Sequence, residues 1–249
     1  MTDRIALVTG CSRGVGAALC NVLLDRGWRV HGVARGPAPS DLIQKGLVQH
    51  RIDLGDLAEL KRAFCDGLVG ELGLSEARQV ALVNNAGVLA MAPTQDLDLT
   101  ELDAAIRANV TAPTWLMGWF VQHAPSSGRL DLVNLSSGAA SSPYPGWLTY
   151  CTSKAALRMA GRAVAADVAE QPALKGRTIH VLDYAPGVVA TEMQAEIRGA
   201  DPATFPRRER FQALHAEGQL VAPTGPAIEM ADLLDRQDPP AYDERRFGS

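Results

Sequence analysis

The stretch Thr9-Gly10-Cys11-Ser12-Arg13-Gly14-Val15-Gly16 follows the short β-branched run Ile5–Thr9 and opens an apolar helix pattern. A strand, a glycine-rich turn and a helix in this order form the phosphate-binding corner of an open α/β sheet. Gly10 permits the tight turn, Gly14 lets the backbone approach a pyrophosphate, and Gly16 lets the helix pack closely on the strand. The spacing is GxxxGxG rather than GxGxxG, so a purely structural turn is the alternative. We therefore predict a dinucleotide site that includes Gly10, Ser12, Arg13, Gly14, Val15 and Gly16.

The rest of the chain continues the alternation of short β-branched runs with longer Ala- and Leu-rich segments. Strands are predicted at Ile5–Thr9, Arg29–Ala34, Val48–Asp53, Val80–Asn84, Arg129–Leu135 and Thr178–Tyr184, with a short last strand near Tyr242. Helices are predicted at Val15–Arg26, Leu57–Leu72, Glu101–Ala108, Thr114–His123, Tyr150–Glu170 and Pro226–Asp235. This order predicts an α/β fold, with a doubly wound parallel sheet of about seven strands and helices on both faces.

The segment Glu192–Val221 breaks this rhythm, because it is polar, carries four arginines and follows the sixth predicted strand. Long insertions at strand ends often form active-site lids. We therefore expect residues 192–221 to form a substrate lid. No Pro/Gly/Ser-rich linker divides the 249 residues, so we expect one domain over the whole chain.

Composition and charge argue against several classes of protein. The 24 Lys and Arg residues and 28 Asp and Glu residues give a net charge of −4, without a basic run, so no nucleic-acid partner is expected. The apolar stretches fall far short of the roughly 20 residues that span a bilayer, so no membrane partner is expected. The start Met1–Arg4 runs directly into a strand pattern without a signal peptide, which favours a cytoplasmic location.

The four cysteines stand singly, without CxxC spacing or a histidine cluster. Neither a disulfide scaffold nor a metal site is therefore expected. We predict that Cys11, Cys20, Cys65 and Cys151 are reduced and mostly buried thiols.

The end of the second predicted strand bears on the choice of cofactor. Folds that prefer NAD place an acidic residue there, against the ribose 2′-hydroxyl, whereas this chain has Ala34 and Arg35. Arg13 and Arg35 are suitable donors to a 2′-phosphate, so NADP(H) is the predicted cofactor. The alternative is that either arginine is a solvated surface residue.

Two further groups lie at the carboxyl ends of predicted strands, where open sheets bind ligands. Asp53 ends the third strand, where its carboxylate is an acceptor for the adenine amino group, or else a turn aspartate. Asn85, Ala86 and Gly87 follow the fourth strand and are assigned to the same cofactor site.

Tyr150 and Lys154 lie four residues apart in a helix pattern, so their side chains share one face. A tyrosine has an ordinary pKa of about 10. A neighbouring ammonium lowers that pKa and makes proton transfer at neutral pH more efficient. A surface pair on a helix is the alternative.

Three further sites favour a catalytic role for this pair. The hydroxyl of Ser137, after the fifth strand, can bind a substrate carbonyl, or cap the backbone. Asn109 follows a predicted helix, where it can hold a water, kink the next helical segment, or cap the helix. Pro186-Gly187 leaves the sixth strand where a nicotinamide carboxamide can meet the backbone of Val189 and the hydroxyl of Thr191, although Pro-Gly is otherwise a turn.

Taken together, these motifs resemble those of the compact, single-domain short-chain dehydrogenases/reductases over almost the whole chain. In chain order they are TGxxxGxG at Thr9–Gly16, NNAG at Asn84–Gly87, Asn109, Ser137, YxxxK at Tyr150–Lys154 and PGxxxT at Pro186–Thr191. The resemblance implies a Rossmann-type fold and a catalytic set of Asn109, Ser137, Tyr150 and Lys154.

The resemblance also implies a role for each catalytic residue. Tyr150 is the general acid that protonates the carbonyl oxygen, and Ser137 polarises that oxygen. Lys154 lowers the pKa of the tyrosine and binds the nicotinamide ribose, while Asn109 supports a proton relay. Hydride comes from the cofactor.

A narrower resemblance rests on Ser12-Arg13-Gly14, Ala34-Arg35, Tyr184-Ala185-Pro186-Gly187, Thr191-Glu192-Met193-Gln194 and Glu217-Gly218-Gln219-Leu220-Val221. Within the family, the C-terminal third is similar to sepiapterin reductases and benzil reductases, which implies NADPH-dependent reduction of a vicinal dicarbonyl or a related ketone. We expect Leu89, Tyr144, Trp147 and Met193 to flank the substrate beside Ser137. An aspartate near the C-terminus anchors the pterin in sepiapterin reductases, and Asp243 stands at about that place, among residues that differ.

The alternatives to a dicarbonyl or aryl-ketone reductase are a pteridine reductase and a non-catalytic NADP-binding sensor. We also expect a homodimer or homotetramer through the helices Thr114–His123 and Tyr150–Glu170, which form the main interface in the resembled family. Their apolar residues exceed what one buried stripe needs: Trp115, Leu116, Trp119, Phe120, Leu157 and Met159. The alternative is that all six pack in the monomer's own core.

Overall fold

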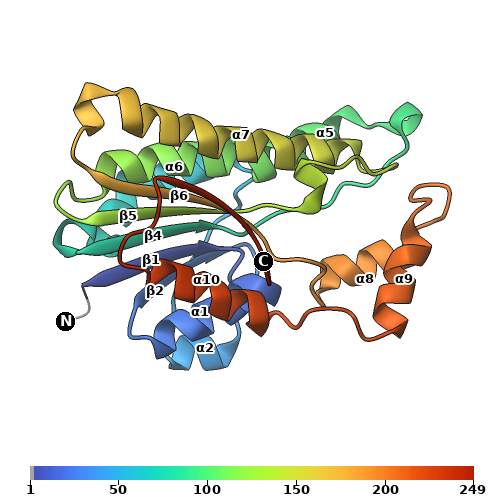
Figure 1. Ribbon diagram of the computed structural model, residues 1–249, viewed down its shortest axis with the longest axis horizontal. Coiled ribbons are helices and arrows are strands. Elements are labelled where there is room, and N and C mark those ends of the chain that lie inside the picture. Colours follow the sequence, from blue (N-terminus) through green and yellow to red (C-terminus); the bar gives the residue numbers. More distant parts are fainter. Residues whose placement is uncertain (1–2) are drawn as a thin grey trace.

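Seven parallel strands form the middle layer of the computed structural model, which describes residues 3–249 (Figure 1). They are β1 (Arg4–Thr9), β2 (Arg29–Ala34), β3 (Val48–Arg51), β4 (Gln79–Asn84), β5 (Arg129–Leu135), β6 (Thr178–Ala185) and β7 (Tyr242–Arg246). Their order in the sheet is β3-β2-β1-β4-β5-β6-β7. Ile5 of β1 lies between Arg29 of β2 and Val80 of β4, where the direction of winding reverses. Ligands bind at such a reversal point in open α/β sheets.

Helices cover both faces of the sheet (Figure 1). One face carries α3 (Leu57–Arg62), α4 (Val69–Leu72), α5 (Leu99–Ile106), α6 (Ala112–His123) and α7 (Leu148–Glu170). The other face carries α1 (Gly14–Asp25), α2 (Ser40–Gln44) and α10 (Thr224–Leu234). The two remaining helices, α8 (Glu192–Gly199) and α9 (Arg208–Ala216), stand beyond the end of the sheet.

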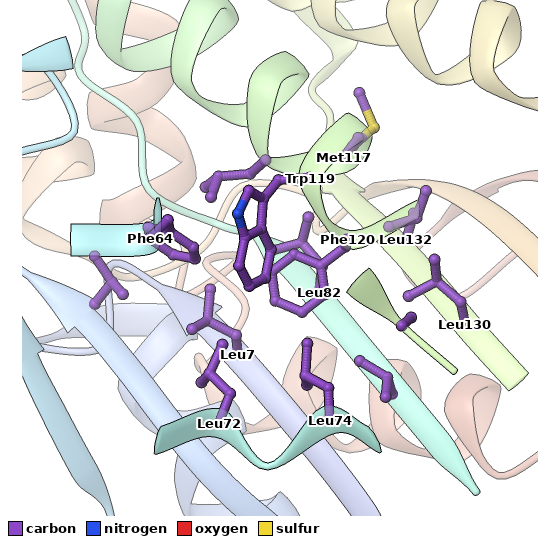
Figure 2. Close-up of a cluster of buried hydrophobic side chains, with 14 of the residues drawn as sticks. Leu7, Phe64, Leu72, Leu74, Leu82, Met117, Trp119, Phe120, Leu130 and Leu132 are labelled. Atoms are coloured by element: carbon purple, nitrogen blue, oxygen red, sulfur yellow. The ribbon is translucent and has the colours of Figure 1, made fainter. Parts of the chain in front are cut away.

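The core has two halves because successive residues of a strand point to opposite faces of the sheet. Leu7 packs with Phe64, Trp119 and Phe120 on the α6 side, as Figure 2 shows. Val8, the next residue of β1, packs on the α1 side instead. Burying one such leucine or phenylalanine contributes about 1.5–3 kcal/mol, so both faces of every inner strand stabilise the fold.

The predicted α/β fold is confirmed, with differences at particular elements. The structure adds α2, which the sequence analysis missed, and widens the predicted helix Leu57–Leu72 into a π-helical stretch over Ala63–Leu68. β3 ends at Arg51 rather than Asp53, because the Asp53 carboxylate accepts the Gly55 N–H at 2.8 Å and turns the chain.

The thiols differ in part from expectation. All four cysteines are free, and Cys11 and Cys20 are buried, but Cys65 is exposed and Cys151 is half-buried. Within residues 3–249, no three His, Cys, Asp or Glu side chains are grouped so that they can hold a metal ion. None of the helices in this part of the chain is both long enough and apolar enough to span a membrane.

Candidate active site

A cleft of about 2130 Å³ opens at the carboxyl ends of the strands, where β1 and β4 meet. Most of the predicted site residues line this cleft. They are Gly10, Ser12, Arg13, Gly14, Val15, Arg35, Asp53, Asn85, Ala86, Gly87, Ser137, Tyr150, Lys154, Pro186, Gly187, Val189 and Thr191. Segments that lie far apart in the sequence therefore form one continuous wall.

The glycine loop packs against the chain that follows β4. A Cβ on Gly16 would lie 2.3 Å from both the Gly10 carbonyl oxygen and the Asn85 Nδ2, so only glycine fits there. Asn85 Nδ2 donates to the carbonyl oxygens of Thr9 at 2.8 Å and Gly10 at 3.2 Å, which fixes the start of the loop. Arg13 is the N-cap residue of α1, and its side chain does not cap the first turn. The backbone N–H groups of that turn are therefore available as donors for a phosphate.

Both candidate phosphate-binding arginines lie at the cleft with a carboxylate beside them. Arg13 pairs with Glu192 at the start of α8, and these side chains are 65% and 64% exposed. Arg35 Nη1 lies 3.9 Å from Asp53 Oδ2. Exposed ion pairs of this kind contribute little, so neither guanidinium is firmly held. The chemistry and position of the two arginines fit a 2′-phosphate.

The first turns of α7 place Tyr150 and Lys154 in the cleft, where both are buried. Lys154 Nζ donates to the Leu135 carbonyl oxygen at 2.8 Å and lies 5.7 Å from the centre of the Tyr150 ring. Ser137 lies beside the Tyr150 phenol, and its Oγ accepts the Ala139 N–H at 3.2 Å. The serine therefore caps the backbone and contacts the tyrosine at once.

Burial controls the protonation of this pair. It raises the pKa of Tyr150 to about 12, although the neighbouring Ser137 hydroxyl acts in the opposite direction. Burial also lowers the pKa of Lys154 to about 8. The pKa of Tyr150 therefore lies above its usual value rather than below it, because desolvation of the phenolate outweighs the effect of the Lys154 ammonium. At neutral pH Tyr150 carries its proton, which is the state that a general acid needs.

Asn109 is buried and does not line the cleft. It lies within a π-helical turn at Arg107–Thr111 that joins α5 to α6. Its Oδ1 accepts the Val88 N–H, and its Nδ2 donates to the Val88 carbonyl oxygen, both at 2.8 Å. The same Nδ2 donates to Ser153 Oγ at 3.2 Å. The amide thus joins the segment after β4 to α7 rather than capping a helix.

The segment after β6 brings two predicted contacts to the cleft. Val189 forms an isolated parallel bridge with Val221. The Thr191 hydroxyl accepts the Gln194 N–H at 3.4 Å and caps α8. The backbone of Val189 and the hydroxyl of Thr191 therefore lie where the next helix begins.

The predicted substrate residues divide into two groups. Leu89, Tyr144, Trp147 and Met193 line the cleft beside Ser137. Asp243 does not: it lies on β7 opposite Leu182, and its carboxylate accepts from Arg245 Nε at 2.8 Å. The expectation that Asp243 reaches the substrate is not met, because Leu182 precedes the carboxyl end of β6 by three residues.

Two aromatic residues of the same region were not predicted from the sequence. Phe205 and Phe211 are buried with Trp147 and Tyr150 in an apolar cluster, and Phe211 lines the cleft. The signal was present as two phenylalanines within an otherwise polar, arginine-rich stretch. The segment as a whole is polar, so these two phenylalanines were not recognised as buried residues.

Comparisons with known proteins agree with this geometry. The family described as short chain dehydrogenase matches residues 4–202. The benzil reductase ((S)-benzoin forming) of Bacillus subtilis is 34% identical over 245 residues, covering 97% of this chain and 98% of its own. The sepiapterin reductase of Meriones unguiculatus is 33% identical over 252 residues, covering 93% of this chain and 91% of its own. A crystal structure of a short chain dehydrogenase/reductase from Saccharomyces cerevisiae, 25% identical, superposes with a TM-score of 0.81 over 99% of this chain and 96% of that one.

Proposed function

Since the chain belongs to the short chain dehydrogenase family, whose members bind nicotinamide cofactors, we propose that it is an NADPH-dependent reductase of vicinal dicarbonyl compounds or aryl ketones. One observation carries the proposal. Ser137, Tyr150 and Lys154 lie on the same cleft as the glycine loop, next to a wall of aromatic side chains. Benzil, named in the B. subtilis relative, is a compound of this class.

The proton comes from Tyr150 in this proposal. Bound NADPH would supply the hydride. The Ser137 hydroxyl contacts the phenol, so the same carbonyl oxygen can accept hydrogen bonds from both groups. As Tyr150 loses its proton, the ammonium of Lys154 stabilises the phenolate across the low-dielectric site. Asn109 holds the Val88 segment in place and contributes to a proton relay.

NADP(H) is favoured over NAD(H) by the residues after β2. Arg35 lies there in place of a carboxylate that would repel a 2′-phosphate, and Arg13 adds a second guanidinium from the glycine loop. Asp53 accepts from Gly55 and is assigned to the adenine side of the same cleft. The uncapped first turn of α1 fits the diphosphate.

The substrate wall favours a flat, apolar ketone. Tyr144 and Trp147 stack with 4.8 Å between ring centres, and Leu89 and Met193 pack against the same cluster. Aromatic rings of a substrate bind well on such a surface. A pterin would need an acceptor for its ring N–H groups, and Asp243, the predicted anchor, is bound to Arg245 outside the cleft.

Two further parts of the proposal concern the whole chain. We assign residues 192–221 to a lid, because Met193, Ile197 and Phe211 of this segment line the cleft. The protein acts as a homodimer or homotetramer through the outer surface of α6 and α7.

Absorbance of the reduced cofactor tests the function directly. The purified protein is mixed with NADPH and benzil, with simple aryl ketones and with sepiapterin in parallel. We expect fast oxidation of NADPH with the diketone and slow oxidation with sepiapterin. Efficient turnover of sepiapterin with poor turnover of diketones would identify a pteridine reductase instead. Binding of NADPH without turnover of any carbonyl compound would identify a cofactor sensor.

A further inference from the structure

Phe205 lies between α8 and α9 and is completely buried, although its neighbours in the sequence are mostly polar or charged. Its ring stacks on the Trp147 indole with 4.8 Å between ring centres and 8° between ring planes. Phe211 of α9 lies 5.6 Å from each of these two rings. The segment 192–221 therefore inserts two aromatic side chains into the wall beside the catalytic residues, and Phe205 is the one that stacks flat on Trp147.

The backbone beneath the stack is fitted to this contact. Gly146 has a φ of +79°, and a Cβ at this position would lie 2.1 Å from the Thr204 carbonyl oxygen. The Gly146 carbonyl oxygen accepts the Ala92 N–H at 3.0 Å, which limits movement away from the segment. Only glycine allows the two backbones to approach this closely.

Other contacts hold the segment at its ends and at the same turn. Near its ends, Val221 N–H donates to the Val188 carbonyl oxygen and Ala190 N–H donates to the Val221 carbonyl oxygen, both at 2.9 Å. In its middle, Arg207 Nη1 donates to the Pro143 carbonyl oxygen at 3.3 Å. The middle of the segment thus docks on the turn that leads into α7.

Trp147 links this docking to the reaction centre. It is the residue before α7 and stands three positions before Tyr150. Its indole meets the Tyr150 ring edge-on, with 5.6 Å between ring centres and 80° between planes. Because Trp147 is 4% exposed, its ring partners determine where the indole lies.

We propose that Phe205 is a positioning residue for Tyr150. Docking of residues 192–221 places Phe205 on Trp147, and the indole then holds the phenol ring in the orientation that meets the substrate carbonyl. The inference rests on the proposed role of Tyr150 as the general acid. It makes proton donation depend on closure of the segment, so that a carbonyl compound is reduced only when it is covered.

The test uses Phe205→Ala, the milder Phe205→Leu, and Leu214→Ala as the matched control. Leu214 of α9 packs against the same apolar cluster and is not one of the ring partners of Trp147. Trypsin cleavage at Arg207, Arg208 and Arg210 measures docking without turnover. The side chains of Arg207 and Arg210 are already exposed, so cleavage depends on local opening that frees the backbone for the protease. We expect cleavage to be roughly tenfold faster in Phe205→Ala than in Leu214→Ala.

Steady-state kinetics then separate positioning from simple lid stability. We expect kcat to fall about tenfold or more in Phe205→Ala, less in Phe205→Leu and little in Leu214→Ala, with NADPH affinity within about twofold of wild type. A rise in KM with an unchanged kcat would overturn the positioning role. Unchanged NADPH binding also shows that the variants fold, and Phe205→Leu carries the test if Phe205→Ala does not fold.

A double-mutant cycle with Trp147→Phe locates the pathway. If the indole carries the effect, Phe205→Ala lowers kcat by less than about twofold in the Trp147→Phe background. Full multiplication of the two effects would contradict the proposal. Failure of the proposed function gives a different result: the wild type reduces no carbonyl compound. In that case, wild-type cleavage rates in Phe205→Ala would overturn the docking role as well, and faster cleavage would support it.

Discussion

Tyr150 is the residue whose removal most directly tests the chemistry. Phe at this position keeps the ring that packs edge-on against Trp147 and removes the transferable proton. A general acid contributes about 10²–10⁴-fold, so we expect kcat of Tyr150→Phe to fall by at least that lower factor. Affinity for NADPH, measured by fluorescence titration, should change little. Retention of more than about a tenth of the wild-type turnover would remove Tyr150 from the mechanism.

The charge of Lys154 determines how kcat for reduction is expected to depend on pH. Burial lowers its pKa to about 8, so the ammonium is present below that pH and is lost as the pH rises through it. Tyr150, whose pKa burial raises to about 12, keeps its proton across the same range. We therefore expect kcat for reduction to decline above pH 8, and to decline at a higher pH in Lys154→Arg, whose guanidinium stays charged. A rate that stays constant up to pH 10 would contradict this assignment.

Arg35 sets the expected preference between cofactors. A charge-assisted hydrogen bond to a 2′-phosphate contributes about 1.5–3 kcal/mol, which corresponds to roughly tenfold or more in affinity. Arg35→Ala should lower the ratio of kcat/KM for NADPH to that for NADH by this factor. Arg62→Ala, on the surface of α3, is the control and should leave the ratio unchanged. Equal use of both cofactors by the wild type would show that the arginine does not select.

At the scale of elements, helices and strands with a clear hydrophobic pattern were predicted from the sequence. Elements whose conformation depends on tertiary contacts were not. The strands were found because they are buried on both faces and are rich in β-branched residues. The π-helical turn around Asn109 has no such signal, since its side-chain bonds to Val88 form only when distant segments meet. Helices α8 and α9 were missed because their few apolar residues pack in the small cluster around Trp147 and do not form a long apolar stripe.

A buried polar chain across four strands gives a prediction at the same scale. Asn84 Nδ2 donates to Asn134 Oδ1 at 3.0 Å, and Asn134 Nδ2 donates to Asp183 Oδ1 at 3.1 Å. The Tyr242 hydroxyl donates to the other oxygen, Asp183 Oδ2, at 2.7 Å. Burial nevertheless dominates and raises the pKa of Asp183 from 3.8 to about 6.

The sign of the stability effect follows from proton binding. Between pH 4 and 6 the unfolded chain releases the Asp183 proton while the folded protein retains it, so this contribution to stability falls as the pH rises. The difference of about two between the pKa of Asp183 in the folded and unfolded states corresponds to roughly 3 kcal/mol of unfolding free energy. Urea unfolding at pH 4 and pH 7 should therefore show wild type losing up to about this much relative to Asp183→Asn. Parallel losses in both proteins would mean that Asp183 titrates normally.

At the scale of the whole molecule, the sheet order and the site agree because four of the motifs stand at the ends of strands: the glycine loop, Asn84–Gly87, Ser137 and Pro186–Thr191. Parallel strands bring all carboxyl ends to one edge, so the order of motifs along the chain was enough to predict one cleft. Asp243 shows the limit of that reasoning. Its distance from the C-terminus matched the pterin anchor, but the register of β7 against β6 is a tertiary property and decides where the carboxylate lies.

Tertiary packing also decides which apolar residues of α6 and α7 remain on the surface. Leu116, Trp119, Phe120 and Leu157 are buried within the monomer's own core, so the apparent surplus of apolar residues on these helices is largely used there. Trp115 is partly buried and packs edge-on against Phe64. Met159, 60% exposed on α7, is left on the outer surface.

That outer surface still favours self-association. Around Met159 it carries the exposed small residues Ala155 and Ala163, and the neighbouring α6 exposes Thr114 and Gly118. Small residues let two helices approach closely, and a two-fold axis would bring the same patch of each copy together.

Met159→Glu places a carboxylate in this contact, where it loses solvation and meets its own symmetry copy. Sedimentation at micromolar concentration should give at least twice the chain mass for wild type and for Ile43→Glu, which alters an exposed residue of α2. Met159→Glu should lose this association and give a smaller mass. A wild type that sediments as a monomer would overturn the dimer, and a dimeric Met159→Glu would move the interface to another surface.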